Sequence, residues 1–228
     1  PQSELRLKDR RVRLAPAPPY PAISPARGRR WAALGRAPLR FPYFNSTFML
    51  TKTIIGIDPG TREMGLVVLR GNVLVWFGVR TLPNGKRHHE AIGLAKQIVL
   101  NLIEEHDPDT VAIEKPFDLP TKRSHLLNVI ADELRDRVEE LGIEVAELSP
   151  ETIRARVTGN PRATKIDVAE YLVAHGFGHM RQFVPKRPAR AALGLRPKDK
   201  YWLHMFDALA IAVGASETYQ PAERTRPM

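Results

Sequence analysis

Residues 54–69 read IIGIDPGTREMGLVVL. Two apolar runs flank Asp58-Pro59-Gly60, and a Pro-Gly pair is a strong turn signal. A strand over Thr53–Asp58 is therefore expected to turn back into a second strand over Gly65–Arg70. This stretch predicts an antiparallel pair of buried strands, with an aspartate at the carboxyl end of the first.

The rest of the chain alternates strand and helix patterns. Three antiparallel strands are followed by strand–helix–strand units, an order that predicts an α/β protein with a mixed five-stranded sheet flanked by helices. The further predicted strands are Val73–Arg80 (after a Gly71-Asn72 hairpin turn), Asp109–Glu114 and Ile143–Leu148; the predicted helices are His88–Glu105, Thr121–Leu141, one that follows the cap Ser149-Pro150, Lys165–Ala174 and Tyr201–Ala215.

Composition excludes several classes of protein. The 228 residues suffice for one domain with a sizeable core. The absence of cysteine excludes disulfides, thiolate metal sites and cysteine nucleophiles. No apolar run approaches the roughly 18–20 residues of a membrane helix, so no bilayer span is expected. A cytoplasmic protein fits these features.

The net charge of +10 is concentrated at the start of the chain. Residues 1–48 hold ten Lys/Arg against two Asp/Glu, together with eight of the 20 prolines. They are predicted to form a disordered basic extension: a nucleic-acid tether, a targeting peptide, or sequence upstream of a natural start at Met49, which we favour. A folded domain is expected over 49–219 and a flexible tail over 220–228.

Acidic residues end two predicted strands and interrupt one apolar helix. Asp58 and Glu114 close strands, while His204 and Asp207 share a helix face at i,i+3 spacing. Taken alone, Asp58 is more simply explained as a solvated turn residue, and Glu114 as the point where its strand leaves the core. Asp207 is harder to explain in this way, because an unpaired charge inside an apolar helix is costly to bury. A shared Mg²⁺ or Mn²⁺ would offset the cost of all three carboxylates.

Three segments resemble the signature regions of one family. IIGIDPGTREMGLVVL, DPDTVAIEKPF (107–117) and HMFDALAIAVG (204–214) are similar, in their order and their places at strand and helix ends, to those of RuvC-type Holliday junction resolvases in the RNase H-like nuclease superfamily. The resemblance covers Thr53–Ser216. It implies an RNase H-like fold and a metal-dependent endonuclease that cuts branched DNA, such as a four-way junction, in recombination and repair.

The resemblance also assigns a catalytic set. It implies that Asp58, Glu114, His204 and Asp207 bind two Mg²⁺ or Mn²⁺ ions, with Asp58 bridging them, and that cleavage leaves 5′-phosphate and 3′-hydroxyl ends. His204 stands where some members carry a carboxylate and others a histidine. Because imidazole favours softer transition metals, His204 predicts a preference for Mn²⁺. The alternative is a histidine that only packs or caps the helix.

DNA contacts are expected from basic and aromatic residues. By resemblance, Phe117 stacks on bases and Arg154 and Lys165 lie near the scissile phosphate; the alternatives are a core phenylalanine and solvated surface charges. Arg156 and Arg162 fall in the same basic stretch, which favours phosphate contact. Residues 181–200 hold seven Lys/Arg and one acid, including Lys186, Arg187 and Lys198. This loop either grips a DNA arm or only aids solubility.

The expected partners are branched DNA and a second copy of the chain. The helix Thr121–Leu141 corresponds to the one around which family members dimerise, although its apolar stripe is equally typical of core packing. A homodimer in the cytoplasm, at the nucleoid, is expected. The rival functions are a YqgF-type nuclease that processes ribosomal RNA, a sugar or acetate kinase, and a non-catalytic nucleic-acid-binding module.

Overall fold

The computed structural model describes residues 51–83, 88–115, 122–186 and 195–216, all within one compact unit, Met49–Met228. The predicted basic extension 1–48 and tail 220–228 lie outside the described residues. The elements are β1 (Thr53–Asp58), β2 (Glu63–Arg70), β3 (Val73–Thr81), α1 (His88–His106), β4 (Thr110–Glu114), α2 (Lys122–Glu140), β5 (Glu144–Leu148), α3 (Pro150–Thr158), α4 (Lys165–Ala174), a short 3₁₀ helix (Gly178–Phe183) and α5 (Pro197–Ala215). None of the helices in these ranges is long and apolar enough to cross a bilayer.

The five strands form one mixed sheet in the order β3-β2-β1-β4-β5. Strand β1 pairs antiparallel with β2 and parallel with β4. Strands β2 and β3 are antiparallel, and β4 and β5 are parallel. The predicted α/β fold with a mixed five-stranded sheet is confirmed. In this order the central strand β1 ends beside β4, so Asp58 and Glu114 close neighbouring strands.

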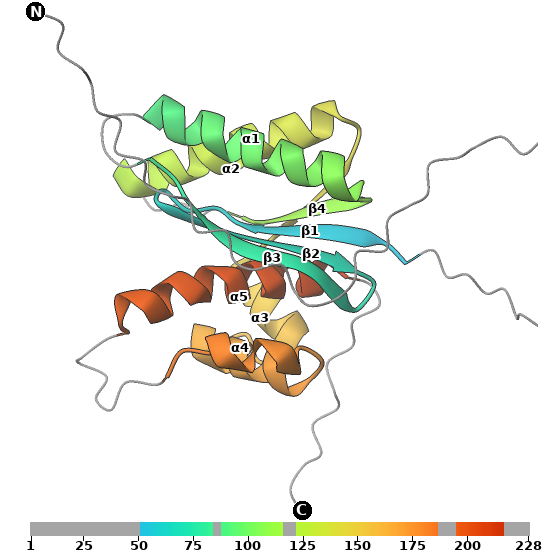
Figure 1. Cartoon of the computed structure of the whole chain (residues 1–228), viewed down its shortest axis with the longest axis vertical. Coiled ribbons are helices and arrows are strands. Elements are labelled where there is room, and N and C mark those ends of the chain that lie inside the picture. Colours follow the sequence, from blue (N-terminus) through green and yellow to red (C-terminus); the bar gives the residue numbers. More distant parts are fainter. Residues whose placement is uncertain (1–50, 84–87, 116–121, 187–194, 217–228) are drawn as a thin grey trace, which may run out of the picture. The chain divides into compact units, whose positions relative to one another are not determined.

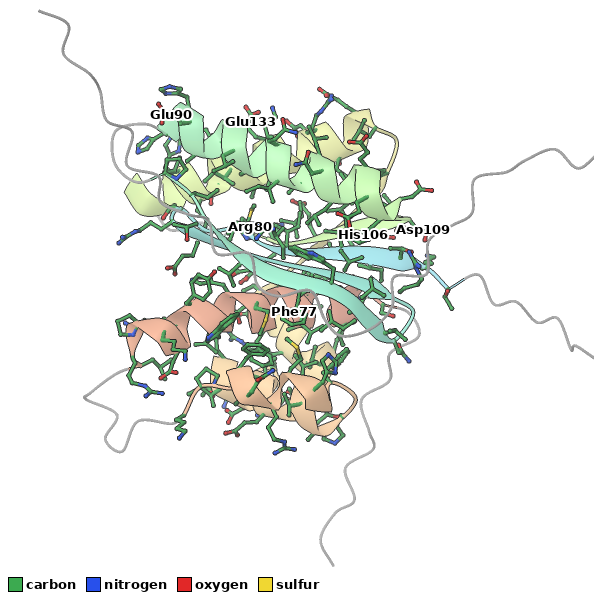
Figure 2. The ribbon with its side chains drawn as sticks, in the orientation of Figure 1. Phe77, Arg80, Glu90, His106, Asp109 and Glu133 are labelled. Atoms are coloured by element: carbon green, nitrogen blue, oxygen red, sulfur yellow. The ribbon has the colours of Figure 1, made fainter. Side chains whose placement is uncertain are left out.

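Helices cover both faces of the sheet. Figure 1 shows α1 and α2 on one face and α5 on the other, with α3 and α4 beyond α5. Side chains alternate between the two faces, as the period of a strand requires. On β1, Ile55 and Ile57 pack toward α1 and α2, while Ile54 packs toward α5. Phe77 of β3 also points to the α5 side (Figure 2).

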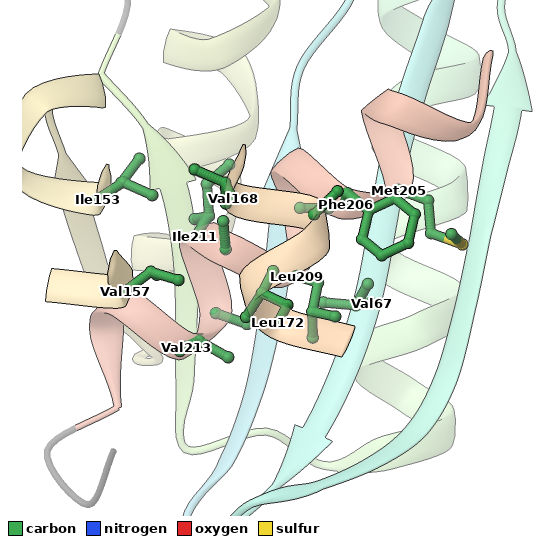
Figure 3. Close-up of a cluster of buried hydrophobic side chains, with 14 of the residues drawn as sticks. Val67, Ile153, Val157, Val168, Leu172, Met205, Phe206, Leu209, Ile211 and Val213 are labelled. Atoms are coloured by element: carbon green, nitrogen blue, oxygen red, sulfur yellow. The ribbon is translucent and has the colours of Figure 1, made fainter. Parts of the chain in front are cut away.

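The core on the α5 side joins the sheet to three helices. Figure 3 shows Val67 of β2 close to Phe206 and Leu209 of α5, with Leu172 of α4 and Ile153 of α3 in the same apolar cluster. Every residue of α5 from Ala208 to Gly214 is buried. Helix α5 is therefore a central element of the core, and its polar residues His204 and Asp207 are held in place by the packing around them.

Two glycines let α5 approach the strands closely. A Cβ atom on Gly56 of β1 would lie 2.3 Å from the backbone oxygen of Ala208. A Cβ atom on Gly65 of β2 would lie 1.8 Å from the backbone oxygen of His204. Both distances are far below van der Waals contact, so only glycine fits at these positions. The backbone of α5 thus rests on the backbones of β1 and β2 at the turns that carry His204 and Asp207.

The predicted cap of α3 is confirmed, while two elements begin earlier than predicted. Ser149 caps α3 by accepting a hydrogen bond from the backbone N–H of Thr152 at 3.2 Å. Helix α5 begins at Pro197 instead of the predicted Tyr201, because proline fits the first turn, where its missing N–H has no helical partner. Strand β2 begins at Glu63, two residues before the predicted start, because Glu63 continues the pairing with β3.

The close approach of α5 predicts a specific sensitivity at Gly56. Replacing Gly56 by alanine should lower the free energy of unfolding by about 1–3 kcal/mol, because the added methyl overpacks against the α5 backbone. Gly93 in α1 is the matched control, since its Cβ position has no neighbour within 4 Å. Gly93→Ala should raise stability by about 0.5–1 kcal/mol. Urea unfolding measures both; equal effects at the two glycines would contradict the packing described.

Candidate active site

Three ligand groups converge where β1 meets α5. Asp58 ends β1 and is 7% exposed. Its Oδ2 lies 2.6 Å from Nδ1 of His204. Asp207 follows one turn later on the same face of α5, and one ligand atom from each of Asp58, His204 and Asp207 lies within 4.8 Å of the other two. The predicted i,i+3 pair on α5 therefore faces the predicted strand-end aspartate.

Glu114 reaches the same region from β4. Because Ile113 packs toward α1 and α2, the alternation along β4 turns Glu114 to the α5 face. Glu114 and Asp207 line one pocket, together with Arg154 and Lys165. The structure thus brings together all four residues of the predicted catalytic set. Asp58, His204 and Asp207 form a tight group, and Glu114 lines the same pocket as Asp207.

The carboxylates are crowded enough to resist ionisation. Burial, and then the charges of Asp58 and Asp207, raise the pKa of Glu114 to about 7. Burial also raises the pKa of Asp207, although the Lys165 ammonium opposes the rise. Burial lowers the pKa of His204, but the hydrogen bond and charge of Asp58 outweigh burial and hold that pKa above its usual value. Shifts of this kind, caused by burial and like charges in a cleft, are typical of functional sites.

Lys165 supplies a positive charge to this cluster. Its Nζ donates a hydrogen bond to Oδ2 of Asp207, while the side chain as a whole remains 52% exposed. Burial lowers the pKa of Lys165, but the charges of Asp207, Asp58 and Glu114 outweigh it, so the pKa lies above its ordinary value. The side chain of Lys165 is therefore partly exposed to solvent, while its ammonium contacts the cluster of carboxylates.

The other predicted DNA-contact residues separate into groups. Arg154 lines the pocket with Lys165. Arg156 points elsewhere: its Nη1 donates to the backbone oxygen of Gly214 at 2.8 Å, near the C-terminus of α5. The side chains of Arg162, Lys186 and Lys198 are exposed. Phe117 and Arg187 lie outside the described residues, so base stacking by Phe117 stays a prediction.

Glu63 is a member of the site that the sequence reasoning missed. Its Oε2 lies 3.5 Å from Nε2 of His204, on the opposite side of the ring from Asp58. The signal was present in the sequence, because Glu63 precedes Gly65 by two residues and so shares its sheet face. The predicted second strand began only at Gly65, so Glu63 lay outside it and its face was not assigned.

The chain is similar to a family of known proteins. The family model "Crossover junction endodeoxyribonuclease RuvC" matches residues 54–195. The chain belongs to the RuvC family. The matched range contains Asp58, Glu114 and Lys165, while His204 and Asp207 lie beyond it. The structure brings these two residues to the matched part of the site through the packing of α5.

Curated relatives and a solved structure agree with this assignment. The RuvC of Cytophaga hutchinsonii is 35% identical over 56% of this chain and 66% of its own length. The RuvC of Bacteroides fragilis is 33% identical over 53% of this chain and 67% of its own. In structure, Thermus thermophilus RuvC in complex with a Holliday junction substrate superposes with a TM-score of 0.57 at 22% identity, over 75% of this chain and 99% of that one. This last likeness confirms the RNase H-like fold.

The donor set fits a divalent cation. One buried carboxylate, one half-buried carboxylate and one imidazole offer ligand atoms within 4.8 Å of one another, and a further carboxylate lines the pocket beside them. Carboxylate oxygens suit Mg²⁺ and Mn²⁺, and an imidazole nitrogen is a better ligand for Mn²⁺ than for Mg²⁺. Burial, together with the neighbouring carboxylates, raises the pKa values of Glu114 and Asp207, and a cation would offset the cost of holding both in the charged form.

Lys165 neutralises part of the carboxylate charge when no metal is bound, so replacing it should lower the stability of the metal-free protein most. At pH 8 in EDTA, Lys165→Met should lower the melting temperature by roughly 2–4 °C, because solvent screening limits such a pair to about 1 kcal/mol. With Mn²⁺ the loss should shrink, since the ion takes over the neutralisation. Lys96→Met, which removes the partly buried Lys96–Glu133 pair on another part of the surface, is the control and should show no metal dependence. Equal losses with and without Mn²⁺ would count against this account.

Proposed function

We propose that this protein is a Holliday junction resolvase of the RuvC family, a metal-dependent endonuclease that acts in DNA recombination and repair. Family membership supports this function, as do curated relatives named crossover junction endodeoxyribonuclease. The observation that carries the proposal is the convergence of Asp58, His204 and Asp207 on one point, with Glu114 across the same pocket. Four possible metal ligands from three separate elements would not be expected to gather in one place if these residues only faced solvent.

The proposed cofactor is a pair of Mg²⁺ or Mn²⁺ ions. Asp58, Glu114, His204 and Asp207 would hold them, and bound ions of this kind activate water and stabilise the leaving 3′ oxygen, which leaves 5′-phosphate and 3′-hydroxyl ends. The chain itself supplies preorganisation. The sheet fixes Asp58 and Glu114, and the core fixes α5, so the ligands need little reorganisation on binding.

Two basic residues beside the carboxylates give the pocket positive charge that can attract a DNA phosphate. Arg154 and Lys165 line the same pocket as Glu114 and Asp207, so a phosphate placed there meets two cations next to the ligand cluster. Phosphate contacts of this kind position a nucleic acid without reading its sequence. Arg154 and Lys165 are therefore proposed to orient the scissile phosphate. Arg156 is engaged with α5, which leaves its predicted phosphate contact without support from this geometry.

We propose that the resolvase works as a homodimer in the cytoplasm, at the nucleoid, where its DNA substrate lies. Symmetric cutting of two strands needs two sites. The predicted α2 stripe is largely core, since Ile130, Leu134 and Val138 are buried under the helix. Leu127 and Val129 of α2 are partly exposed and provide the apolar surface for a second copy.

The dimer proposal predicts a mass twice that of the chain. Light scattering at micromolar concentration should show a dimer, and Leu127→Glu should shift it toward monomer, because a charge in an apolar interface is costly to desolvate. Leu94→Glu is the control, since Leu94 of α1 is 39% exposed on another helix. A monomer in the parent protein, with and without a four-way junction, would refute the dimer and leave the nuclease proposal standing.

The catalytic proposal predicts a separation of binding from cleavage. Asp58→Asn should slow cleavage of a synthetic four-way junction by more than the ~10–100-fold that loss of an outer-shell partner costs, because it removes a direct ligand. Junction binding in gel shifts should persist, since the basic residues remain. Asp132→Asn, an exposed acid on α2, is the control and should cut like the parent. Near-parental turnover by Asp58→Asn would sink the proposed mechanism.

A further inference from the structure

Glu63 lies at the same end of the sheet as the catalytic carboxylates. In β1 and β2, Asp58 pairs with Gly65, and Glu63 is two residues before Gly65 on β2. The alternation of β2 therefore directs Glu63 to the α5 face, where Val67 also packs. Three acids, Asp58, Glu63 and Glu114, thus project from three strands toward the same turns of α5.

Two carboxylates lie on opposite sides of the His204 ring. Asp58 Oδ2 is 2.6 Å from Nδ1, and Glu63 Oε2 is 3.5 Å from Nε2. The first distance is that of a short hydrogen bond, while the second is an electrostatic contact. A neutral imidazole carries a proton on one nitrogen only, and an ionised carboxylate can only accept. In the metal-free molecule the short contact with Asp58 therefore requires a proton on Nδ1. With a divalent ion at Nδ1, the one remaining ring proton would lie on Nε2, the nitrogen that faces Glu63.

The backbone of Glu63 is held firmly, although its side chain is 37% exposed. A Cβ atom on Gly60 would lie 1.8 Å from the backbone oxygen of Glu63, so the turn after β1 is packed directly against this residue. The backbone N–H of Leu82 donates to the oxygen of Arg62 at 2.7 Å, which ties the start of β2 to the end of β3. A fixed backbone keeps the base of the Glu63 side chain at the end of the sheet where His204 lies.

We propose that Glu63 is a positioning residue that holds the proton of His204 on Nε2 and so presents Nδ1 to a divalent ion shared with Asp58 and Asp207. This inference rests on the proposed function, because it assigns the nitrogen through which His204 serves the metal site. Histidine ligands commonly donate their second ring N–H to a carboxylate, which fixes the tautomer and the ring orientation. Glu63 occupies the place of that carboxylate.

The test measures Mn²⁺ binding by the DNA-free protein, with free Mn²⁺ followed by electron paramagnetic resonance. Glu63→Ala should weaken Mn²⁺ binding by about 10–100-fold, the usual cost of losing such a partner. Glu63→Gln should lose less, because its amide oxygen still accepts from Nε2–H. Glu139→Gln removes the same charge from an exposed position on α2 and should bind like the parent. A Glu63→Ala protein that binds Mn²⁺ as tightly as Glu139→Gln overturns the proposal.

A second measurement does not depend on the folding of any variant. In the ¹⁵N-labelled parent protein with Mg²⁺, the ring nitrogens of His204 should report a proton on Nε2 and none on Nδ1; a proton found on Nδ1 overturns the proposal. The two hypotheses also fail separately. A parent protein that binds no Mn²⁺ and leaves four-way junctions uncut refutes the resolvase function and this inference with it. A parent that binds and cuts, with Glu63→Ala equal to it in Mn²⁺ affinity, refutes the role of Glu63 alone.

Discussion

Helix α5 rests on the backbones of β1 and β2 because Gly56 and Gly65 carry no Cβ atoms to hold it away. This contact determines where His204 and Asp207 lie, since both are on the turns of α5 that cross the sheet at these glycines. The apolar run that follows them is buried from Ala208 to Gly214, and its burial supplies the free energy that keeps the helix in register. The position of the ligand group is therefore a consequence of core packing, and the rigidity of the core becomes the rigidity of the site.

The same contact has an electrostatic cost. It brings Asp207 and His204 to a strand end that already holds Asp58, with Glu114 beside them in a partly buried pocket. Burial and like charges then raise the pKa of Glu114 to about 7, so ionisation of Glu114 is disfavoured in the metal-free molecule. The Lys165 ammonium offsets part of this electrostatic cost by donating a hydrogen bond to Asp207. A divalent cation bound among these carboxylates would therefore stabilise the folded protein. The same residues would then determine both stability and function.

Much of this arrangement could be predicted from the sequence, because local rules determine it. The apolar period and the Pro-Gly turn placed β1 at Thr53–Asp58, and helical spacing placed α4 at Lys165–Ala174; both agree with the structure. What could not be predicted depends on contacts between distant segments. The hydrogen bond from Arg156 to Gly214 spans 58 positions, and no local pattern indicates it. Strand alternation could have placed Glu63 on the α5 face, but its contact with His204 joins segments even further apart. The α2 stripe was open to two interpretations, and only burial against the sheet shows that most of it is core.

We propose that α5 and β1 together bind divalent metal through Asp58, His204 and Asp207. Anomalous diffraction from crystals grown with Mn²⁺ tests it most directly, because the scattering locates the ion without reference to activity. We expect a Mn²⁺ peak among the side chains of Asp58, His204 and Asp207, with the Lys165 ammonium withdrawn from Asp207. Saturating Mn²⁺ that leaves this position empty, or that occupies another part of the molecule alone, would contradict it.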